Sequence, residues 1–328
     1  MSGDAIAAQV RAMARGPSRG RGLTQDEARD ALSAILAGEA APEAVGALFM
    51  LMRYRGEDAG EIAGFVEALR ARVGPWAAAD AAVDWPSYAA GRTRGLPLFL
   101  LSAKLVASTG RPVLLHGWNS HLTHPVTPLA GIKALGIAIA PSPDAAKRAL
   151  ANEGIAYAPL DALDAEALRL LQLRRVLGLR SPLNTALRAL NPATAPTTVQ
   201  GVFHPTYRAL QTDAANLLGQ KAIGVIKGGG GEFERHPGKS IELYGYGAEP
   251  FDLKMPAMTN AAARRLKDDE APPTVDQLVG LWTGEAEDPF AADVVIATAG
   301  AALLVAGAAG TIEEADTMAA DLWRARAR

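Results

Sequence analysis

Apolar residues occur at helical spacing between Thr24 and Val73, in three short runs separated by glycine or by a proline start. Thr24 and Glu27 have the spacing of a capping box, in which each side chain satisfies a backbone N–H at the helix start. Gly38 suits the end of the first helix, and Pro42 suits the first position of the second. The stripes predict a small helical bundle, and part of its Ala-rich apolar surface is expected to form a homodimer contact. The apolar stripes consist of Ala28, Leu32, Ile35, Leu36, Val45, Leu48, Phe49, Met52, Ile62, Phe65, Val66 and Leu69.

Short apolar runs that alternate with helical segments follow Asp84-Trp85-Pro86. The run at 113–115 is typical of a fully buried strand and ends at His116. This alternation favours an α/β fold with a mainly parallel sheet covered by helices. We expect a small helical domain over residues 1–83, joined in space by helices from about 162–192, and a larger α/β domain over residues 84–328. Further strands are expected at 137–140, 155–158, 198–203, 222–227 and 241–244, and helices at 96–107, about 127–135, 144–152, 168–177, 182–190, 207–218 and 293–307.

The composition is that of a globular protein. Of 328 residues, 49% are hydrophobic and 21% are charged, so the chain is long enough to bury a large core. No run of about 18 apolar residues passes without a charge, glycine or proline, which predicts no membrane span. The first 22 residues lack the apolar core and cleavage site of a secretory signal. The absence of cysteine excludes disulfides and thiolate metal ligands, and we expect a cytoplasmic protein.

The charges are segregated along the chain, although the net charge is only −2. Residues 85–212 carry 13 basic and 5 acidic side chains, whereas residues 213–328 carry 11 basic and 18 acidic ones. No Asp or Glu occurs between Glu166 and Asp213. A block of this kind predicts a localised anionic partner. The alternative is that the blocks intermix in space and their fields cancel.

Residues 177–192 read LGLRSPLNTALRALNP. This segment resembles the LG-x-RT-x-x-N-x-L-x-P-L-x-NP signature of anthranilate phosphoribosyltransferase, in glycosyltransferase family 3. The helical segment 24–73, the Gly201-Val202-Phe203 strand and the closing helices 294–328 follow in the order of that family, so the resemblance covers nearly the whole chain. It implies the fold of that enzyme and of nucleoside phosphorylases, with a small helical domain and a larger α/β domain.

The resemblance also implies how phosphoribosyl pyrophosphate and magnesium are held, and here the sequence departs from the family. The GTGGD loop, whose backbone N–H groups hold the pyrophosphate, is absent, and residues 87–95 read SYAAGRTRG. The hydroxyls of the N-x-ST motif fall near Phe99 and Leu100, and the KHGNR loop loses its lysine in residues 115–120. The Asp-Glu pair that holds magnesium becomes Glu232-Phe233-Glu234. Loss of one preorganised donor typically costs about 10²–10³ in rate, so we expect the ordinary transfer to anthranilate to be lost.

These departures are similar to the second TrpD-like family, of the YbiB type. Residues 91–97, GRTRGLP, and the pair His116-Gly117 carry this resemblance. It implies a homodimer with the transferase fold that binds DNA or RNA in a basic groove, without established phosphoribosyltransferase activity. The leading prediction is therefore a nucleic-acid-binding protein with little sequence preference and no cofactor, in which Arg and Lys hold backbone phosphates.

The guanidinium group suits phosphate because its planar fork donates two parallel hydrogen bonds. Arg92 and Arg94 flank the turn where the family holds pyrophosphate, and Trp118 is a candidate for stacking on a base. Lys227 precedes four glycines whose backbone amides suit a phosphate. The alternatives are that the arginines cap helices or line the dimer contact, that Trp118 packs in the core, and that the glycines form a tight turn. The predicted nucleic-acid or phosphate ligands are Arg92, Arg94, His116, Trp118, Asn119, His121, Arg169, Arg174, Arg175, Arg180 and Lys227.

A second prediction is a glycosyl or phosphoribosyl transferase that acts on an unidentified phosphoribosyl substrate through a modified pocket. Magnesium is expected as a cofactor only in this case. The histidines between residues 116 and 124 match no strong metal-ligand spacing, so no protein-bound metal site is predicted. A purely structural or regulatory partner protein is a third possibility. The working residues of the transferase alternative are His116, Asn119, Arg174, Glu232 and Glu234.

Overall fold

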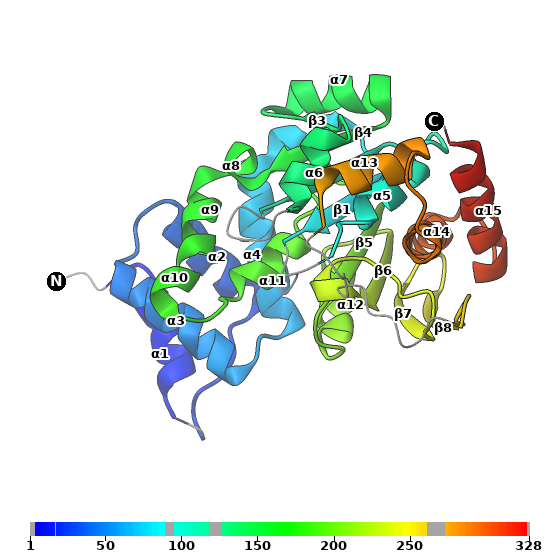
Figure 1. Ribbon diagram of the computed structural model, residues 1–328. Helices are drawn as coiled ribbons and strands as arrows, with labels where there is room; N and C mark the ends of the chain where they lie inside the picture. The colour runs from blue at the N-terminus through cyan, green and yellow to red at the C-terminus, as the bar shows by residue number, and fades with distance from the viewer. Residues whose placement is uncertain (1–3, 17, 89–94, 119–125, 261–272, 327–328) are drawn as a thin grey trace.

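A computed structural model describes residues 4–16, 18–88, 95–118, 126–260 and 273–326 (Figure 1). The N-terminal helices gather at one end of the molecule, and the sheet with its covering helices forms the rest. Within the described ranges, no helix is both long enough and apolar enough to cross a membrane.

Capped helices build the N-terminal end. Thr24 and Glu27 form the predicted capping box, and Asp58 forms a second one with Glu61. Pro42 lies at the predicted helix start, and Gly38 follows the first long helix with a φ of 76°, a left-handed conformation that glycine adopts without strain. These predictions are confirmed. The helices are α1 (Ala7–Ala14), which was not predicted, α2 (Gln25–Leu36), α3 (Pro42–Arg55), α4 (Ala59–Val73) and the 3₁₀ turn η1 (Gly74–Ala79).

One sheet of eight strands runs through the larger part of the molecule in the order β3-β4-β2-β1-β5-β6-β7-β8. The pairs from β3 to β6 are parallel, and only β6-β7 and β7-β8 are antiparallel, so the predicted α/β fold with a mainly parallel sheet is confirmed. The strands are β1 (Val83–Ser87), β2 (Val113–Gly117), β3 (Ala138–Ile139), β4 (Ile155–Pro159), β5 (Thr197–Val202), β6 (Ala222–Lys227), β7 (Ile241–Tyr246) and β8 (Pro250–Met255).

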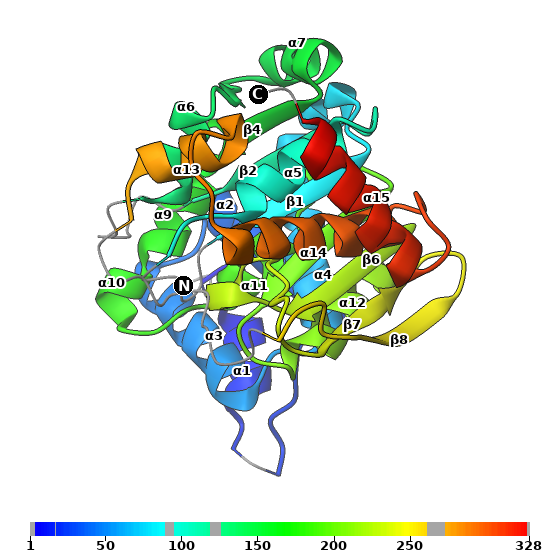
Figure 2. The ribbon, with the colours of Figure 1, turned by 45° about the vertical axis from the view of Figure 1, so that its right-hand side comes forward.

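Helices cover both faces of the sheet, and β2 shows why. Val113 and Leu115 pack into one hydrophobic cluster while Leu114, between them, packs into the other, as the alternation of a strand requires. Figure 2 shows α14 crossing one face of the sheet beside α5 and α15. This layer contains α5 (Phe99–Ala107), α6 (Pro128–Ala134), α13 (Val275–Thr283), α14 (Pro289–Val305) and α15 (Ile312–Ala325).

The opposite cluster joins the N-terminal helices to helices from the middle of the chain. Arg70 of α4 donates a hydrogen bond of 2.8 Å to the carbonyl oxygen of Leu190, just beyond α11. The domain boundary at residue 83 stays a prediction. The middle helices are α7 (Pro143–Glu153), α8 (Leu160–Leu163), α9 (Ala165–Gln172), α10 (Arg174–Leu177), α11 (Leu183–Arg188) and α12 (Tyr207–Leu217).

A buried ion pair ties the segment after β6 to the last helix of the described chain. Arg235 is fully buried, and its Nη1 lies 2.8 Å and 2.9 Å from the two carboxylate oxygens of Asp316 in α15. Its backbone N–H also donates to the Thr298 hydroxyl at 2.9 Å, in α14. Burial raises the pKa of Asp316, and the neighbouring guanidinium opposes that rise. The segment is therefore fixed to the helical layer by charge as well as by packing.

We expect Asp316→Ala to lower the free energy of unfolding by about 3–5 kcal/mol, because it leaves the buried Arg235 charge uncompensated. Asp321→Ala is the matched control, since Asp321 pairs with Arg324 on the exposed side of the same helix and should cost about 0–1 kcal/mol. Urea unfolding followed by circular dichroism measures both. Similar losses in the two variants would show that the buried pair holds nothing in place.

Candidate active site

The carboxyl ends of the central parallel strands meet at one edge of the sheet, where α/β proteins bind their ligands. Ser87 ends β1, Gly117 ends β2 and Lys227 ends β6. The segment after β6 folds back over this edge and brings Glu232 and Glu234 with it. The candidate site is therefore built from residues that lie far apart in the sequence.

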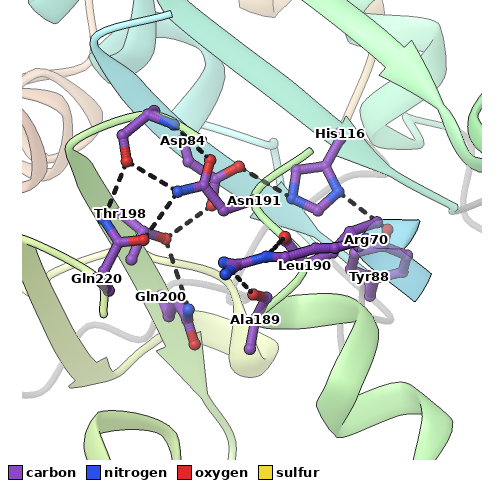
Figure 3. Close-up of polar contacts among 11 residues, drawn as sticks. Arg70, Asp84, Tyr88, His116, Ala189, Leu190, Asn191, Thr198, Gln200 and Gln220 are labelled. Carbon is purple, nitrogen blue, oxygen red and sulfur yellow. Dashed lines mark hydrogen bonds and ion pairs between the residues drawn. The ribbon is translucent and has the colours of Figure 1, made fainter. Parts of the chain in front are cut away.

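Beneath this edge lies a buried polar network centred on His116 (Figure 3). The Nε2 atom of His116 lies 3.2 Å from Oδ1 of Asp84, and its Nδ1 atom lies 3.0 Å from the Tyr88 hydroxyl. Asp84 also accepts a 2.7 Å hydrogen bond from Thr198 in β5. Because His116 is fully buried and both ring nitrogens have neighbours, it positions Asp84 and Tyr88. Its predicted direct contact with a ligand has no geometric support in this placement.

Asn191, in the signature segment, forms side-chain hydrogen bonds that stabilise the segment after α11 (Figure 3). Its side-chain oxygen accepts from the Ala195 backbone N–H at 2.8 Å, and its amide donates to the Ala195 carbonyl and to Gln220, each at 2.8 Å. The φ of Asn191 is 43°, a left-handed conformation that Asn tolerates better than most residues. The signature asparagine is therefore structural in this chain, and it fixes how α11 approaches the site.

Ser87 and Glu232 meet at the strand ends, where the Ser87 hydroxyl donates a 3.1 Å hydrogen bond to Oε1 of Glu232. Both side chains are 1% exposed. Two glycines permit this approach, because a Cβ added at Gly201 would lie 2.0 Å from the Glu232 carbonyl carbon and one at Gly228 would lie 1.7 Å from its oxygen. Any side chain at either glycine would therefore displace the segment that carries Glu232.

Glu234 caps α5, since its Oε1 atom accepts a 3.1 Å hydrogen bond from the backbone N–H of Phe99. A helix start leaves backbone N–H groups without intrahelical partners, and a carboxylate there also complements the helix dipole. The family resemblance placed hydroxyl contacts to phosphate near Phe99 and Leu100. In this chain a buried carboxylate lies at that helix end instead, which disfavours an anion in the same place.

Ser87 and Glu232 suit a magnesium ion that is also bound by a substrate. Among the residues that the structure describes, no three His, Asp or Glu side chains are grouped to hold a metal. Magnesium, however, is commonly bound by one or two carboxylates together with substrate phosphates and water, all of them oxygen ligands. The hydroxyl of Ser87 and the carboxylate of Glu232 are such donors, so they suit an ion that arrives with a phosphorylated substrate.

Arg188 lies near Glu232, and Arg180 lies near Arg188, Arg174 and Arg53, so these four arginines form a cluster. Burial, together with the guanidiniums of Arg174, Arg188 and Arg53, lowers the pKa of Arg180 to about 10. Arg53 lies 3.2 Å from Glu57 and donates to the Tyr207 hydroxyl. Burial also lowers the pKa of Arg188, and the nearby Glu232 carboxylate opposes that effect. The site thus combines buried carboxylates with a cluster of like charges.

The other residues predicted to bind phosphate either lie where binding is less favourable or fall outside the described residues. Arg169 forms an ion pair of 2.6 Å with Glu166, so its charge is neutralised locally. Arg175 and Lys227 are exposed, and Trp118 packs half-buried against the hydrophobic cluster of the N-terminal helices, which is the packing alternative. Arg92, Arg94, Asn119 and His121 lie outside the described residues.

Sequence reasoning missed Ser87, Arg53 and Tyr207. Ser87 directly follows Pro86, which discouraged the prediction of a strand, although the strand would have placed its hydroxyl at the sheet edge. Arg53 lies in the last turn of α3, but nothing in the sequence indicated its contact with Tyr207, 154 positions away. Long-range contacts of this kind depend on how helices pack.

Family comparison agrees with this architecture. The helical bundle domain of a glycosyl transferase family matches residues 18–73, and the a/b domain of a glycosyl transferase family matches residues 96–325. The chain belongs to this glycosyl transferase family. The anthranilate phosphoribosyltransferase of Rhodopseudomonas palustris (strain BisA53) is 31% identical to it over 309 residues, which are 92% of this chain and 89% of that protein. The protein of the same name from Agrobacterium fabrum is 29% identical and covers 93% of this chain and 89% of its own length.

Solved structures with the same fold include anthranilate phosphoribosyltransferase (TrpD) from Thermus thermophilus. Its TM-score is 0.77 at 24% identity, and the match covers 98% of this chain and 94% of the other. The Saccharomyces cerevisiae enzyme in complex with PRPP and Mg has a TM-score of 0.76 at 15% identity, with the same coverage. At these identities the likeness concerns the fold, and it confirms the helical domain joined to a larger α/β domain.

The leading prediction of a nucleic-acid-binding protein is wrong. The relatives that match about nine-tenths of the chain are transferases, and they favour the second prediction. The basic block misled because sequence blocks intermix in space. Arg208 of the basic block pairs at 2.6 Å with Glu242 from the acidic C-terminal third. The resemblance to the YbiB type stays a prediction.

We expect Gly201→Ala to lower the free energy of unfolding by about 1–3 kcal/mol, because its Cβ would overlap the Glu232 backbone and force the segment to move. Gly46→Ala is the control, since Gly46 lies inside α3 and its new Cβ would meet only the Leu177 side chain, at an ordinary contact distance of 3.8 Å. The control should be neutral or more stable by about 0.4–1 kcal/mol. Urea midpoints compare the two, and a neutral Gly201→Ala would refute the close approach.

Proposed function

We propose that this protein is a phosphoribosyltransferase that moves the phosphoribosyl group of phosphoribosyl pyrophosphate to an anionic acceptor. The observation that carries the proposal is the buried Ser87–Glu232 oxygen pair beside an arginine cluster at the carboxyl edge of the parallel sheet. The transferase relatives supply the reaction class, and the PRPP and Mg named for the yeast structure are the donor and ion of such a reaction.

The chemistry follows from that donor. The bond between C1 of the ribose and the pyrophosphate oxygen breaks, and pyrophosphate leaves with the electron pair. A lone pair on the acceptor forms the new bond to C1, and the acceptor's proton passes to the released pyrophosphate. Ser87 and Glu232 would hold magnesium together with the substrate phosphates, and the ion would supply positive charge near the leaving group. The arginines bind and orient the acceptor, and holding the two reactants in position lowers the entropic part of the activation barrier.

The pocket is a modified one, as the departures from the family motifs indicate. Because Glu234 occupies the start of α5, the pyrophosphate is expected to lie nearer the ends of β1 and β6 than the start of that helix. His116 contributes indirectly by holding Asp84 and Tyr88. Glu232 is then the described carboxylate on which binding of the donor depends most.

We expect phosphoribosyl pyrophosphate to bind in a magnesium-dependent manner, and Glu232→Gln to weaken this binding about tenfold or more, since the variant loses the charge that attracts the ion. Isothermal titration calorimetry with and without magnesium measures the effect. Glu285→Gln, an exposed site, is the control and should bind as the unaltered protein does. Absence of binding heat with magnesium, or equal binding by Glu232→Gln, would refute the proposal.

We also infer that the protein forms a homodimer through its N-terminal helices. Exposed apolar side chains support this, because Tyr54 of α3 is 92% exposed, Val176 of α10 is 81% exposed and Leu179 is 57% exposed. Gly46 of α3 faces Leu177, which brings these helices close together. Large exposed apolar side chains on and beside the N-terminal helices are typical of an interaction surface.

Leu179→Glu is expected to shift the protein from dimer to monomer, because a charge buried in an apolar contact is costly. Sedimentation velocity at several concentrations measures the mass. Leu217→Glu, on the similarly exposed Leu217 of α12, should leave the mass unchanged. A monomer in the unaltered protein would rule the dimer out.

A further inference from the structure

Arg188 is the most unusual charge in the molecule. It is the last residue of α11, it is only 8% exposed, and it has no hydrogen bond or ion pair with any residue in the described part of the chain. Its nitrogen atoms are not fully enclosed by protein, so the small exposed area of Arg188 includes its guanidinium group. Burying a charge without a partner costs several kcal/mol or more by the usual estimates. A buried cation with an accessible head therefore indicates an anion that is bound during function.

Arg180 extends the same feature toward the surface. It is half-buried, and it also lacks an ion pair with the described residues. Arg174 is exposed beside it, and the guanidiniums of Arg174 and Arg188 are near enough to lower the pKa of Arg180. Arg53, the fourth member, is compensated by Glu57. Arg180 and Arg188 thus carry two positive charges that no described carboxylate pairs with.

The charge at Arg188 departs from the signature quoted above. The signature to which residues 177–192 are similar has proline at the position of Arg188, whereas its arginine corresponds to Arg180. Proline has no charge and Arg188 adds one at the inner end of the site. The addition lies beside Glu232, whose carboxylate stabilises the charged form of Arg188 without forming an ion pair with it.

We propose that Arg180 and Arg188, with Arg174 at the rim, bind a dianionic oxyanion group, such as a phosphate monoester or a dicarboxylate, on the acceptor. Two guanidiniums match two negative charges, and each planar fork donates two parallel hydrogen bonds to a pair of oxygens. A monocarboxylate such as anthranilate would leave one of these charges without a partner. This proposal rests on the proposed transferase function for the statement that the dianion belongs to the acceptor.

Inorganic phosphate at pH 8, where it is mainly a dianion, is the probe, and thermal unfolding of the full chain is the readout. A ligand that binds the folded state raises the midpoint by mass action. We expect phosphate to raise the midpoint of the unaltered protein and Arg188→Met to weaken phosphate binding about tenfold or more. Without phosphate, Arg188→Met should unfold at a higher midpoint, because the uncompensated buried charge is gone. A merely structural arginine would give a lower one.

Arg148→Met, an exposed site on α7, controls for the change in net charge and should respond to phosphate as the unaltered protein does. Malonate and benzoate separate the chemistries. Binding of malonate but not phosphate assigns the dianion to two carboxylates, and equal binding of phosphate and benzoate overturns the proposal. An unchanged phosphate response in Arg188→Met also overturns it.

The two proposals fail separately, because this experiment uses neither phosphoribosyl pyrophosphate nor magnesium. If Arg188→Met loses phosphate binding but the unaltered protein does not bind phosphoribosyl pyrophosphate, the dianion subsite is supported and the transferase proposal is refuted. If donor binding depends on Glu232 but Arg188→Met binds phosphate as the unaltered protein does, the transferase proposal is supported and the dianion subsite is refuted.

Discussion

The close approach of the segment after β6 to the end of β5 is the constraint on which the site depends. Gly201 and Gly228 have no side chain, so the backbone of Glu232 can lie against them. From that position Glu232 reaches Ser87 and Glu234 reaches the start of α5. Two carboxylates are thus brought into the interior at 1% exposure. Each is stabilised by hydrogen bonds, as a buried charge requires.

The arginine cluster is the opposite case, in which charges of one sign are held together at a cost. Arg180 and Arg188 repel each other and are partly removed from water. Proteins commonly keep such arrangements at functional sites, where the ligand supplies the missing charge. The folded state without a ligand is accordingly less stable than its hydrophobic packing allows. Binding relieves an electrostatic cost that the fold already contains.

Much of the fold was predictable, because apolar helical stripes, capping boxes such as that of Thr24, and buried β-strands are patterns of neighbouring residues. β1 was missed since Asp84 and Pro86 interrupt its apolar run, although all five of its residues are buried. The predicted helix over 168–177 is divided at Leu173 into α9 and α10. The site was harder, because the burial of Arg188 and the cap formed by Glu234 depend on contacts between distant segments. Charge counted along the sequence therefore indicated a false partner, whereas charge located in space indicates a small anion.

The ion pair between Arg235 and Asp316 links the order of synthesis to the assembly of the site. The two residues are 81 positions apart, and Arg235 directly follows the two buried glutamates. While the chain emerges from the ribosome, the Arg235 guanidinium can reach the Pro256 carbonyl oxygen but has no carboxylate partner until α15 has been made. Domains generally fold as units during translation. A nascent chain that ends before α15 would therefore hold all eight strands of the sheet but would lack the carboxylate that fixes Arg235, the residue next to Glu234, to the helical layer.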